Sequence, residues 1–212
     1  IISKVLANRL SRKMNDLIDH SQTAFIKGRQ IVDGVAAVQE YINVCVKNNF
    51  SCAILKLDFE KAFDSIDWDY ICEVCLTRGF SVRWINWIML LLRSGSSNIV
   101  VNGVMGKKIQ SKRGLRQGDP LSPLLFNLAA DVFTRIIKRA GRLGVLGNVG
   151  NDVFNNDLSI LQFADDTLLF SSHLPKQIIA LKFILYCFEM LSGLKINFDR
   201  SSVMVINHID NV

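Results

Sequence analysis

Two adjacent aspartates, Asp165 and Asp166, stand between two short apolar segments, and this arrangement constrains the fold more than any other feature. Residues 158–163 and 167–171 each have the length and composition of a strand, and only three residues separate them. The flanks predict that both carboxylates lie at a sheet edge or at the tip of a hairpin. Two like charges beside apolar strands are unfavourable without a cation, so the pair is a candidate metal site. A solvated turn is the alternative, because aspartate is common in turns.

A third carboxylate ends another segment with the period of a strand. Apolar side chains alternate through residues 53–58 with a period of two, and Asp58 is the last residue. Mg²⁺ prefers a few carboxylate oxygens together with substrate phosphate oxygens. If the two strand ends are neighbours, Asp58, Asp165 and Asp166 could bind two metal ions about 3.5–4 Å apart. Such a pair of ions would stabilise the attacking and leaving oxygens of an in-line phosphoryl transfer.

Helical and strand patterns alternate along the rest of the chain and predict an α+β domain in which antiparallel sheet packs on helices. Asp67 and Ser122 each have the place of an N-cap before a helix. Asn102-Gly103 predicts the turn of a hairpin over residues 98–110. Apolar spacing predicts further helices, at residues 1–19, 31–46, 82–92 and 178–191. Two closing strands are predicted, at residues 196–198 and 203–206.

Composition limits the class of protein. Half of the 212 residues are hydrophobic, which excludes a disordered tail or an extended charged helix. The net charge of +6 weakly favours a polyanionic partner. The longest apolar run, residues 88–92, is far shorter than the roughly 18 residues of a membrane helix, and we expect no signal peptide. Five scattered cysteines favour a reducing compartment, and we expect a chain that starts at Ile1 to be a piece of a longer protein.

Five segments resemble the motifs of reverse transcriptases of the non-LTR (LINE-type) retrotransposon family, in the form common in plant genomes. They occur in the order of that family and span nearly the whole chain. The segments are residues 22–29 (QTAFIKGR), 57–64 (LDFEKAFD), 113–123 (RGLRQGDPLSP), 163–166 (FADD) and 193–197 (GLKIN). The resemblance implies an α+β fold of the right-hand polymerase type: a palm with partial fingers and no thumb. It implies partial fingers at residues 1–50 and a palm at residues 51–212, with interleaved fingers segments near residues 79–118.

The same resemblance implies an RNA-directed DNA polymerase and assigns the three aspartates to catalysis. Asp58, Asp165 and Asp166 match the catalytic aspartates of the family, which hold two Mg²⁺ ions, for which Mn²⁺ can substitute. Asp58 and Asp165 would bind both ions, Asp166 would support them, and the backbone carbonyl of Phe59 would be a further metal ligand. The primer 3′-hydroxyl would then attack the α-phosphorus of an incoming dNTP.

Other matches concern the incoming nucleotide. Phe63 matches the bulky residue beneath the nucleotide sugar, which would exclude a 2′-hydroxyl; the alternative is an ordinary core aromatic. Gln117 and Gly118 match the loop that packs against the nucleotide, and Gly118 allows the backbone to approach closely. Arg116 would face either the triphosphate or the template, and a solvated loop charge is the alternative.

Three further cations are candidate phosphate ligands. Lys27 and Arg29 match the fingers residues that would contact the β- and γ-phosphates, a role that suits cationic donors. Ordinary surface charge is the alternative for both. Lys195 would lie near the leaving pyrophosphate as a proton donor, or would simply end a strand. Arg200 stands where relatives often have lysine, and a guanidinium does not readily donate a proton.

The implied partners are an RNA template, a DNA primer and a dNTP, with no membrane. The resemblance also implies a thumb and an endonuclease region in a longer protein. We expect an intracellular location, nuclear or cytoplasmic, and no secretion. Two alternatives stay open at this point: an inactive retroelement remnant that at most binds nucleic acid, and a group II intron-type reverse transcriptase with a maturase role.

Overall fold

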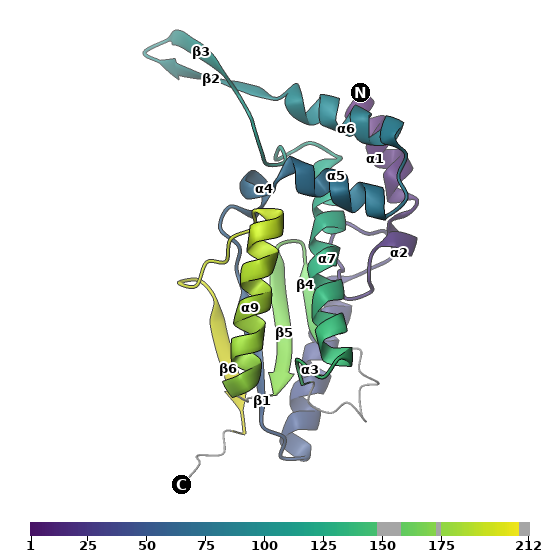
Figure 1. Ribbon diagram of the computed structural model, residues 1–212, viewed down its shortest axis with the longest axis vertical. Coiled ribbons are helices and arrows are strands. Elements are labelled where there is room, and N and C mark those ends of the chain that lie inside the picture. Colours follow the sequence, from purple (N-terminus) through teal and green to yellow (C-terminus); the bar gives the residue numbers. More distant parts are fainter. Residues whose placement is uncertain (148–157, 173–174, 208–212) are drawn as a thin grey trace.

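Figure 1 shows the computed structural model of the chain, which describes residues 1–147, 158–172 and 175–207. The helices are α1 (Ile2–Ser11), α2 (Met14–Leu17), α3 (Ile31–Lys47), α4 (Ala62–Ser65), α5 (Trp68–Thr77), α6 (Val82–Arg93), α7 (Ser122–Arg142) and α9 (Pro175–Ser192). The strands are β1 (Cys52–Leu57), β2 (Ser96–Val101), β3 (Val104–Gln110), β4 (Ile160–Phe163), β5 (Asp166–Ser172) and β6 (Ser202–Ile206). This mixture of sheet and helices is the α+β class that the patterns predict.

The central sheet has four strands in the order β4-β5-β1-β6, and every neighbouring pair is antiparallel. Strand β1 pairs with β5 on one side and with β6 on the other, although more than a hundred residues separate it from either. Leu57 lies opposite Thr167 in this register, and Phe163 lies opposite Asp166. The last residues of β1 and the first residues of β5 therefore meet at one edge of the sheet.

Helices cover both faces of the sheet because its side chains alternate between two apolar clusters. Leu57 and Leu169 are buried with Phe133 of α7 and Phe188 of α9 in the larger cluster. Figure 1 shows α7 and α9 lying along the sheet. Ile54, Phe170, Tyr41, Cys45 and Cys52 form a smaller cluster that seats α3. The neighbouring rings of Tyr41 and Phe170 have centroids 4.7 Å apart, which fixes α3 against the opposite face.

A second group of helices extends the core beyond the sheet. Buried side chains of α1, α5 and α6 join the larger cluster, among them Leu10, Ile71 and Ile88. The β2–β3 hairpin projects away from these helices, at the end of the molecule shown uppermost in Figure 1. Within the described part of the chain, no helix combines the length and the apolar character that a bilayer span needs.

Several local predictions are confirmed. Asp67 caps α5, since its side chain accepts hydrogen bonds from the backbone N–H groups of Asp69 and Tyr70. The hairpin turn is at Asn102-Gly103, where both residues have positive φ (51° and 80°). The predicted helices at residues 31–46 and 82–92 are α3 and α6.

Three local predictions are wrong. Ser122 does not cap α7: it is buried inside the first turn, Leu121 is the N-cap, and Asp119 Oδ1 accepts from the Leu121 N–H at 2.8 Å. The predicted helix at residues 1–19 is broken into α1 and α2. Residues 196–198 form only an isolated bridge, from Ile196 to Phe59, because the chain turns immediately afterwards.

Candidate active site

The three predicted catalytic aspartates lie at neighbouring strand ends. Asp58 follows directly after β1, and Asp166 is the first residue of β5, the strand that pairs with β1. Asp165 occupies the second position of the two-residue loop between β4 and β5. Asp58 and Asp165 are half-buried, whereas Asp166 is exposed. Antiparallel pairing thus brings together carboxylates that are more than a hundred residues apart in the chain.

The carboxylates at these strand ends are oxygen donors, the type of ligand that Mg²⁺ prefers. Two or three carboxylates with a nearby main-chain carbonyl and open access for substrate oxygens are what Mg²⁺ requires. Within residues 1–147, 158–172 and 175–207, however, no three His, Cys, Asp or Glu side chains stand close enough to enclose a metal ion. The metal site at these strand ends therefore stays a prediction.

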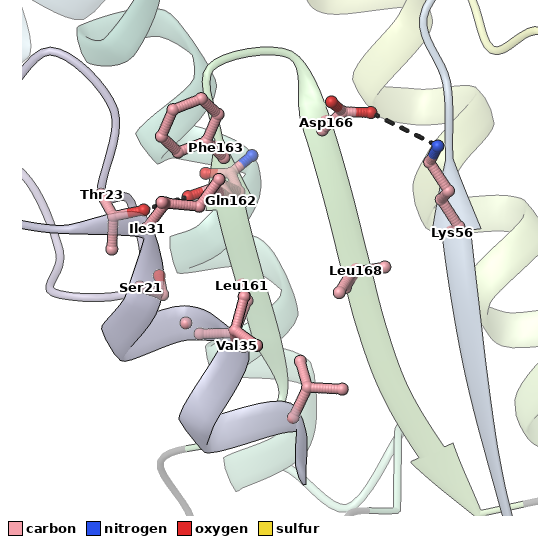
Figure 2. Close-up of a pocket in the computed structure, with 12 residues that line it drawn as sticks. Ser21, Thr23, Ile31, Val35, Lys56, Leu161, Gln162, Phe163, Asp166 and Leu168 are labelled. Atoms are coloured by element: carbon pink, nitrogen blue, oxygen red, sulfur yellow. Dashed lines mark hydrogen bonds and ion pairs between the residues drawn. The ribbon is translucent and has the colours of Figure 1, made fainter.

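One carboxylate has a cation beside it. Figure 2 shows Asp166 directed across the sheet towards Lys56 of β1, and the Lys56 Nζ atom lies 3.8 Å from Asp166 Oδ1. Their side chains are 53% and 63% exposed, so solvent screens the pair and its contribution to stability is small. A weak pair of this kind leaves Asp166 available to exchange its partner for another cation.

The backbone after β1 is held by the segment that follows α9. The Asp58 carbonyl accepts from the Asn197 N–H at 2.9 Å, and the Glu60 N–H donates to the Lys195 carbonyl at 2.8 Å. Alternate residues of a strand direct their N–H and C=O groups to opposite sides. The Phe59 carbonyl is therefore directed away from this segment, towards the side on which β5 lies. That orientation suits the predicted role of Phe59 as a main-chain metal ligand.

The β4–β5 turn holds an unusual conformation. Ala164 precedes Asp165 and has a φ of +56°, in the left-handed region that non-glycine residues avoid at a cost of roughly 1–2 kcal/mol. The side chain of Gln22, fully buried, hydrogen-bonds both the N–H and the C=O of Ala164. The sequence patterns assign no role to Gln22. Its place in the first quoted motif is the only signal that could have pointed to it.

Phe63 lies in α4 beside the loop that resembles the nucleotide motif. Its half-buried ring stacks on Phe126 of α7, with centroids 4.6 Å apart and an interplanar angle of 16°. Its carbonyl accepts from the Leu115 N–H at 2.6 Å. Gly114 packs so closely that an added Cβ would lie 2.5 Å from the Asp64 carbonyl oxygen, and its φ is +84°. Only glycine fits there, so this close approach brings residues 113–118 next to Phe63.

The remaining loop residues diverge in direction. Gln117 and Gly118 are exposed, and Gly118 has a φ of +85° that favours glycine. The Arg116 guanidinium lies against Gly95, where an added Cβ would be 2.6 Å from it. Arg116 is therefore directed to the base of the β2–β3 hairpin. Asp119 anchors the loop to α1 by accepting a hydrogen bond from the Ser3 hydroxyl.

The two fingers cations differ in their surroundings. The Arg29 guanidinium donates to the carbonyls of Ile18, Asp19 and Gln22, and burial lowers its pKa from the ordinary value. These bonds give Arg29 an anchoring role in the loop, so a phosphate contact by this residue stays a prediction. Lys27 is exposed on the same loop.

Two cavities lie beside the strand ends that carry Asp58 and Asp166. One, of about 770 Å³, is polar and is lined by Asp58, Lys195, Arg113 and Arg200; Lys195 Nζ lies 3.4 Å from Glu60 Oε2. The other, of about 350 Å³, lies between α3 and the β4–β5 hairpin and is largely apolar. Figure 2 shows its lining residues, which include Ile31, Val35, Leu161, Phe163, Leu168 and Asp166. The structure thus brings Lys195 to the Asp58 side of the edge.

Comparison with known proteins identifies the family. Residues 1–209 match the family model described as reverse transcriptase (RNA-dependent DNA polymerase). The chain is 34% identical over 163 residues to the Pol polyprotein of a type-1 retrotransposable element R2 from Nasonia vitripennis, covering 74% of this chain and 15% of that protein. It is 27% identical over 207 residues to the 149 kDa protein of transposon TX1 from Xenopus laevis, covering 95% of this chain and 15% of that protein. The chain therefore spans less than a fifth of these relatives.

The fold has known counterparts as well. An apo telomerase from Candida tropicalis, truncated from its C-terminal domain, superposes with a TM-score of 0.70 at 13% identity, covering 98% of this chain and 41% of that one. At this identity the likeness concerns the fold alone, and it agrees with a polymerase palm in which antiparallel sheet packs on helices. The chain belongs to the reverse transcriptase (RNA-dependent DNA polymerase) family, as a domain of the non-LTR retrotransposon type.

Proposed function

We propose that this chain is the catalytic core of an enzyme that copies RNA into DNA by transferring nucleotides from dNTPs to a primer 3′-hydroxyl. One observation carries the proposal: Asp58, Asp165 and Asp166 lie at the adjoining ends of β1 and β5 in a chain of this family. Acidic side chains concentrated at one sheet edge, beside a polar cavity, suit metal-assisted phosphoryl transfer.

Asp58, Asp165 and the Phe59 carbonyl would hold two Mg²⁺ ions, or Mn²⁺ in their place, with Asp166 in support. When bound, the ions would lower the pKa of the primer hydroxyl and neutralise charge on the leaving pyrophosphate. The chain's own part is to present these oxygens from strands whose backbones are fixed by pairing. Lys56 would balance the charge of Asp166 while the site is being filled.

The nucleotide would enter through the polar cavity on the Asp58 side. Phe63 would lie under the sugar, where its ring, fixed by stacking on Phe126, would exclude a 2′-hydroxyl. Gln117 and Gly118 would contact the nucleotide from the exposed loop, and Lys195 would face the triphosphate once released from Glu60. Lys27 and Arg29 would contact the β- and γ-phosphates, and Arg116 would face either the triphosphate or the template.

The template would be RNA and the primer DNA, bound by their backbones through the excess of basic residues. We assign residues 1–50 to partial fingers and residues 51–212 to the palm, with fingers segments near residues 79–118; α3, inside the first range, packs on the sheet. Such synthesis would take place in the nucleus or cytoplasm. A thumb and an endonuclease region would belong to a longer protein.

Primer extension on an RNA template with dNTPs and Mg²⁺ tests the proposal. We expect the wild type to extend the primer and Asp165→Asn to lose at least about 100-fold in rate, because an essential metal ligand is gone. Asp16→Asn is the matched control, since Asp16 is an exposed carboxylate paired only weakly with Lys13. Extension that survives Asp165→Asn would refute the proposal. A lack of extension by a folded wild-type protein that includes the natural flanking sequence would refute it as well.

A further inference from the structure

We propose that Gln22 is a positioning residue of the β4–β5 turn, Ala164-Asp165, which we call the catalytic turn. Its side-chain amide holds the main chain of Ala164 and thereby fixes the direction of Asp165 and Asp166. The effect on catalysis rests on the proposed function. The hydrogen bonds between Gln22 and Ala164 do not depend on it, because they are seen in the protein without substrate. The side-chain amide of Gln22 hydrogen-bonds main-chain groups of Ala164 and Ala24, so it would act on the aspartates through the turn.

The first step concerns where Gln22 lies. Residues 21–23 run parallel to the end of β4, with a bridge between Gln22 and Gln162. The Thr23 N–H donates to the Gln162 carbonyl at 3.0 Å, and the Gln162 N–H donates to the Ser21 carbonyl at 2.8 Å. Figure 2 shows Ser21 and Thr23 beside the β4 residues Gln162 and Phe163. The segment therefore lies along the outer edge of β4, next to the catalytic turn.

The second step concerns the side-chain amide. Gln22 Oε1 accepts from the Ala164 N–H at 3.1 Å, and Gln22 Nε2 donates to the Ala164 carbonyl at 3.2 Å. Oε1 also accepts from the Ala24 N–H at 3.1 Å. Gln22 has no exposed surface, so these bonds form without competition from water. One side chain thus pairs with both main-chain polar groups of one residue.

The third step concerns the residue that is held. Ala164 has a φ of +56° and directly precedes Asp165. Turns of this kind favour glycine or asparagine at such a position, and alanine has no local means of stabilising it. The two hydrogen bonds from Gln22 supply the missing support. Because the direction of the Asp165 side chain follows from the backbone at Ala164, loosening this clamp would let the carboxylate move.

The fourth step concerns the rigidity of the clamp itself. Arg29 donates to the Gln22 carbonyl at 2.7 Å, and the neighbouring Thr23 N–H donates to the Gln162 carbonyl of β4 at 3.0 Å. The main chain on which the Gln22 side chain is mounted is thereby fixed at Gln22 itself and at the next residue. A side chain mounted on a rigid element can hold a catalytic group to the precision that such a group needs.

Steady-state primer extension tests the catalytic part. Gln22→Met keeps the shape and removes all three hydrogen bonds, and we expect kcat to fall by about 100-fold, because a misplacement near 1 Å has that cost. We expect the KM for dNTP to change by less than about threefold, and the Mg²⁺ concentration for half-maximal rate to rise. Gln22→Glu keeps the acceptor of the Ala164 N–H and should recover part of kcat.

Asn127→Ala is the matched control. Asn127 is as buried as Gln22, and its side-chain amide donates to the Ala24 carbonyl of the same segment rather than to the main chain of Ala164. It should lose comparable thermal stability and keep kcat within about threefold of the wild type. Equal kcat losses in Gln22→Met and Asn127→Ala would overturn the proposal, because the effect would then follow stability alone.

Amide hydrogen exchange, followed by NMR, tests the geometric part without any need for activity. Gln22→Met should speed exchange of the Ala164 N–H at least about tenfold, and Asn127→Ala should leave it unchanged. Unchanged exchange in folded Gln22→Met would overturn the clamp. A wild type that extends no primer would instead refute the proposed function, and the exchange measurement would still decide whether the clamp exists.

Discussion

Two hairpins in the described part of the chain, β2–β3 and β4–β5, have loops of the same length but are stabilised in different ways. Asn102 and Gly103 connect β2 to β3, whereas Ala164 and Asp165 connect β4 to β5. Each loop places a residue at positive φ immediately after its first strand, at +51° and +56°. The two turns therefore make a similar demand on the backbone, and they meet it differently.

The β2–β3 hairpin depends on local chemistry. Asn-Gly is the preferred pair for a turn with two positive φ values, and both residues adopt them. Every residue of the two strands is exposed, including several large apolar side chains: Ile99, Val100, Val101, Val104, Met105 and Ile109. Within the described residues, the hairpin stands out from the body of the protein (Figure 1), and its turn sequence is what specifies it.

The β4–β5 hairpin depends on tertiary contacts. Ile160 and Leu169 are buried in the main cluster, and Gln22 holds the Ala164 backbone from outside. Its turn has a residue type that disfavours the conformation. Strain of this kind persists where surrounding structure over-determines it, which happens most often at functional sites. The difference shows that a positive φ in a hairpin loop can be stabilised by the residue types of the loop itself or by residues far away in the sequence.

The largest expected effect comes from removing Asp131 of α7, a buried carboxylate that holds the main chain at Asp19, three residues before Gln22. Asp131 has no exposed surface; it accepts from the Asp19 N–H and from Arg135 Nε, each at 2.7 Å, and from Arg78. Asp131→Ala should lower the free energy of unfolding by about 3–5 kcal/mol in a urea titration, because buried partners lose their counter-charge. Arg135→Ala is the control: Arg135 is 57% exposed, so we expect a loss below about 1 kcal/mol. Similar losses in both variants would contradict a buried anchor.

A matched pair of core and surface truncations tests the comparison directly. Leu169→Ala in β5 should cost about 2–5 kcal/mol of unfolding free energy, because Leu169 is 2% exposed. Ile109→Ala in β3 should cost less than about 0.5 kcal/mol, because Ile109 is 52% exposed. Denaturant unfolding measures both. A large loss for Ile109→Ala would show that the β2–β3 hairpin has tertiary support after all.

Changing the two turns should have opposite local consequences. Gly103→Ala places a Cβ at a φ of +80° and should weaken the hairpin by roughly 1–2 kcal/mol, seen as faster amide exchange in β2 and β3. Ala164→Gly relieves a comparable strain but removes a buried methyl group, so unfolding free energy should stay within about 1 kcal/mol of the wild type. A strong destabilisation by Ala164→Gly would mean that Ala164 is not strained.

The smallest expected effect is a dependence on pH. Burial acts to raise the pKa of Asp19, but hydrogen bonds from Lys138 and Ser21 outweigh it and the pKa lies below the ordinary 3.8. A lowered pKa gives stability that is present above the unfolded-state pKa and is lost as pH falls through the folded-state value. Asp19→Asn should therefore lower the free energy of unfolding at pH 6, and this loss should vanish as the pH falls below 3.8 and through the folded-state pKa.

Lys138 donates to Asp19 at 2.8 Å and 2.9 Å, so Lys138→Met should reproduce this profile. Thermal unfolding across the pH range checks both variants. A penalty of Asp19→Asn that persists in acid would show that shape rather than charge holds the segment.

Much of the fold was accessible to local patterns. The N-cap at Asp67, the turn at Asn102-Gly103 and the strand before Asp58 follow from residue types within a few positions of one another. Local patterns failed at the start of α7, where the expected capping side chain is buried and another residue accepts the hydrogen bond. Ser122 resembles a cap but is buried in the first turn of α7, where Leu121 is the cap residue and Asp119 accepts the Leu121 N–H.

The candidate site divides in the same way. That Asp58, Asp165 and Asp166 end strands could be predicted, because alternation along a strand reveals where it stops. That β1 pairs with β5, so that the strand ends carrying the aspartates adjoin, depends on pairing over more than a hundred residues. The engagement of Arg29 with three carbonyls was equally beyond a local pattern, which shows charge but not the acceptors around it.

The sequence by itself determined the order of the elements, the acidic ends of two strands and the five motifs of the family. Tertiary structure alone decided which strand ends meet, which cations are anchored and that Gln22 holds the turn before Asp165. The physical reason is the range of the interactions. Periodicity and capping arise between neighbours in the chain, whereas a buried amide finds its partners only after distant segments have packed.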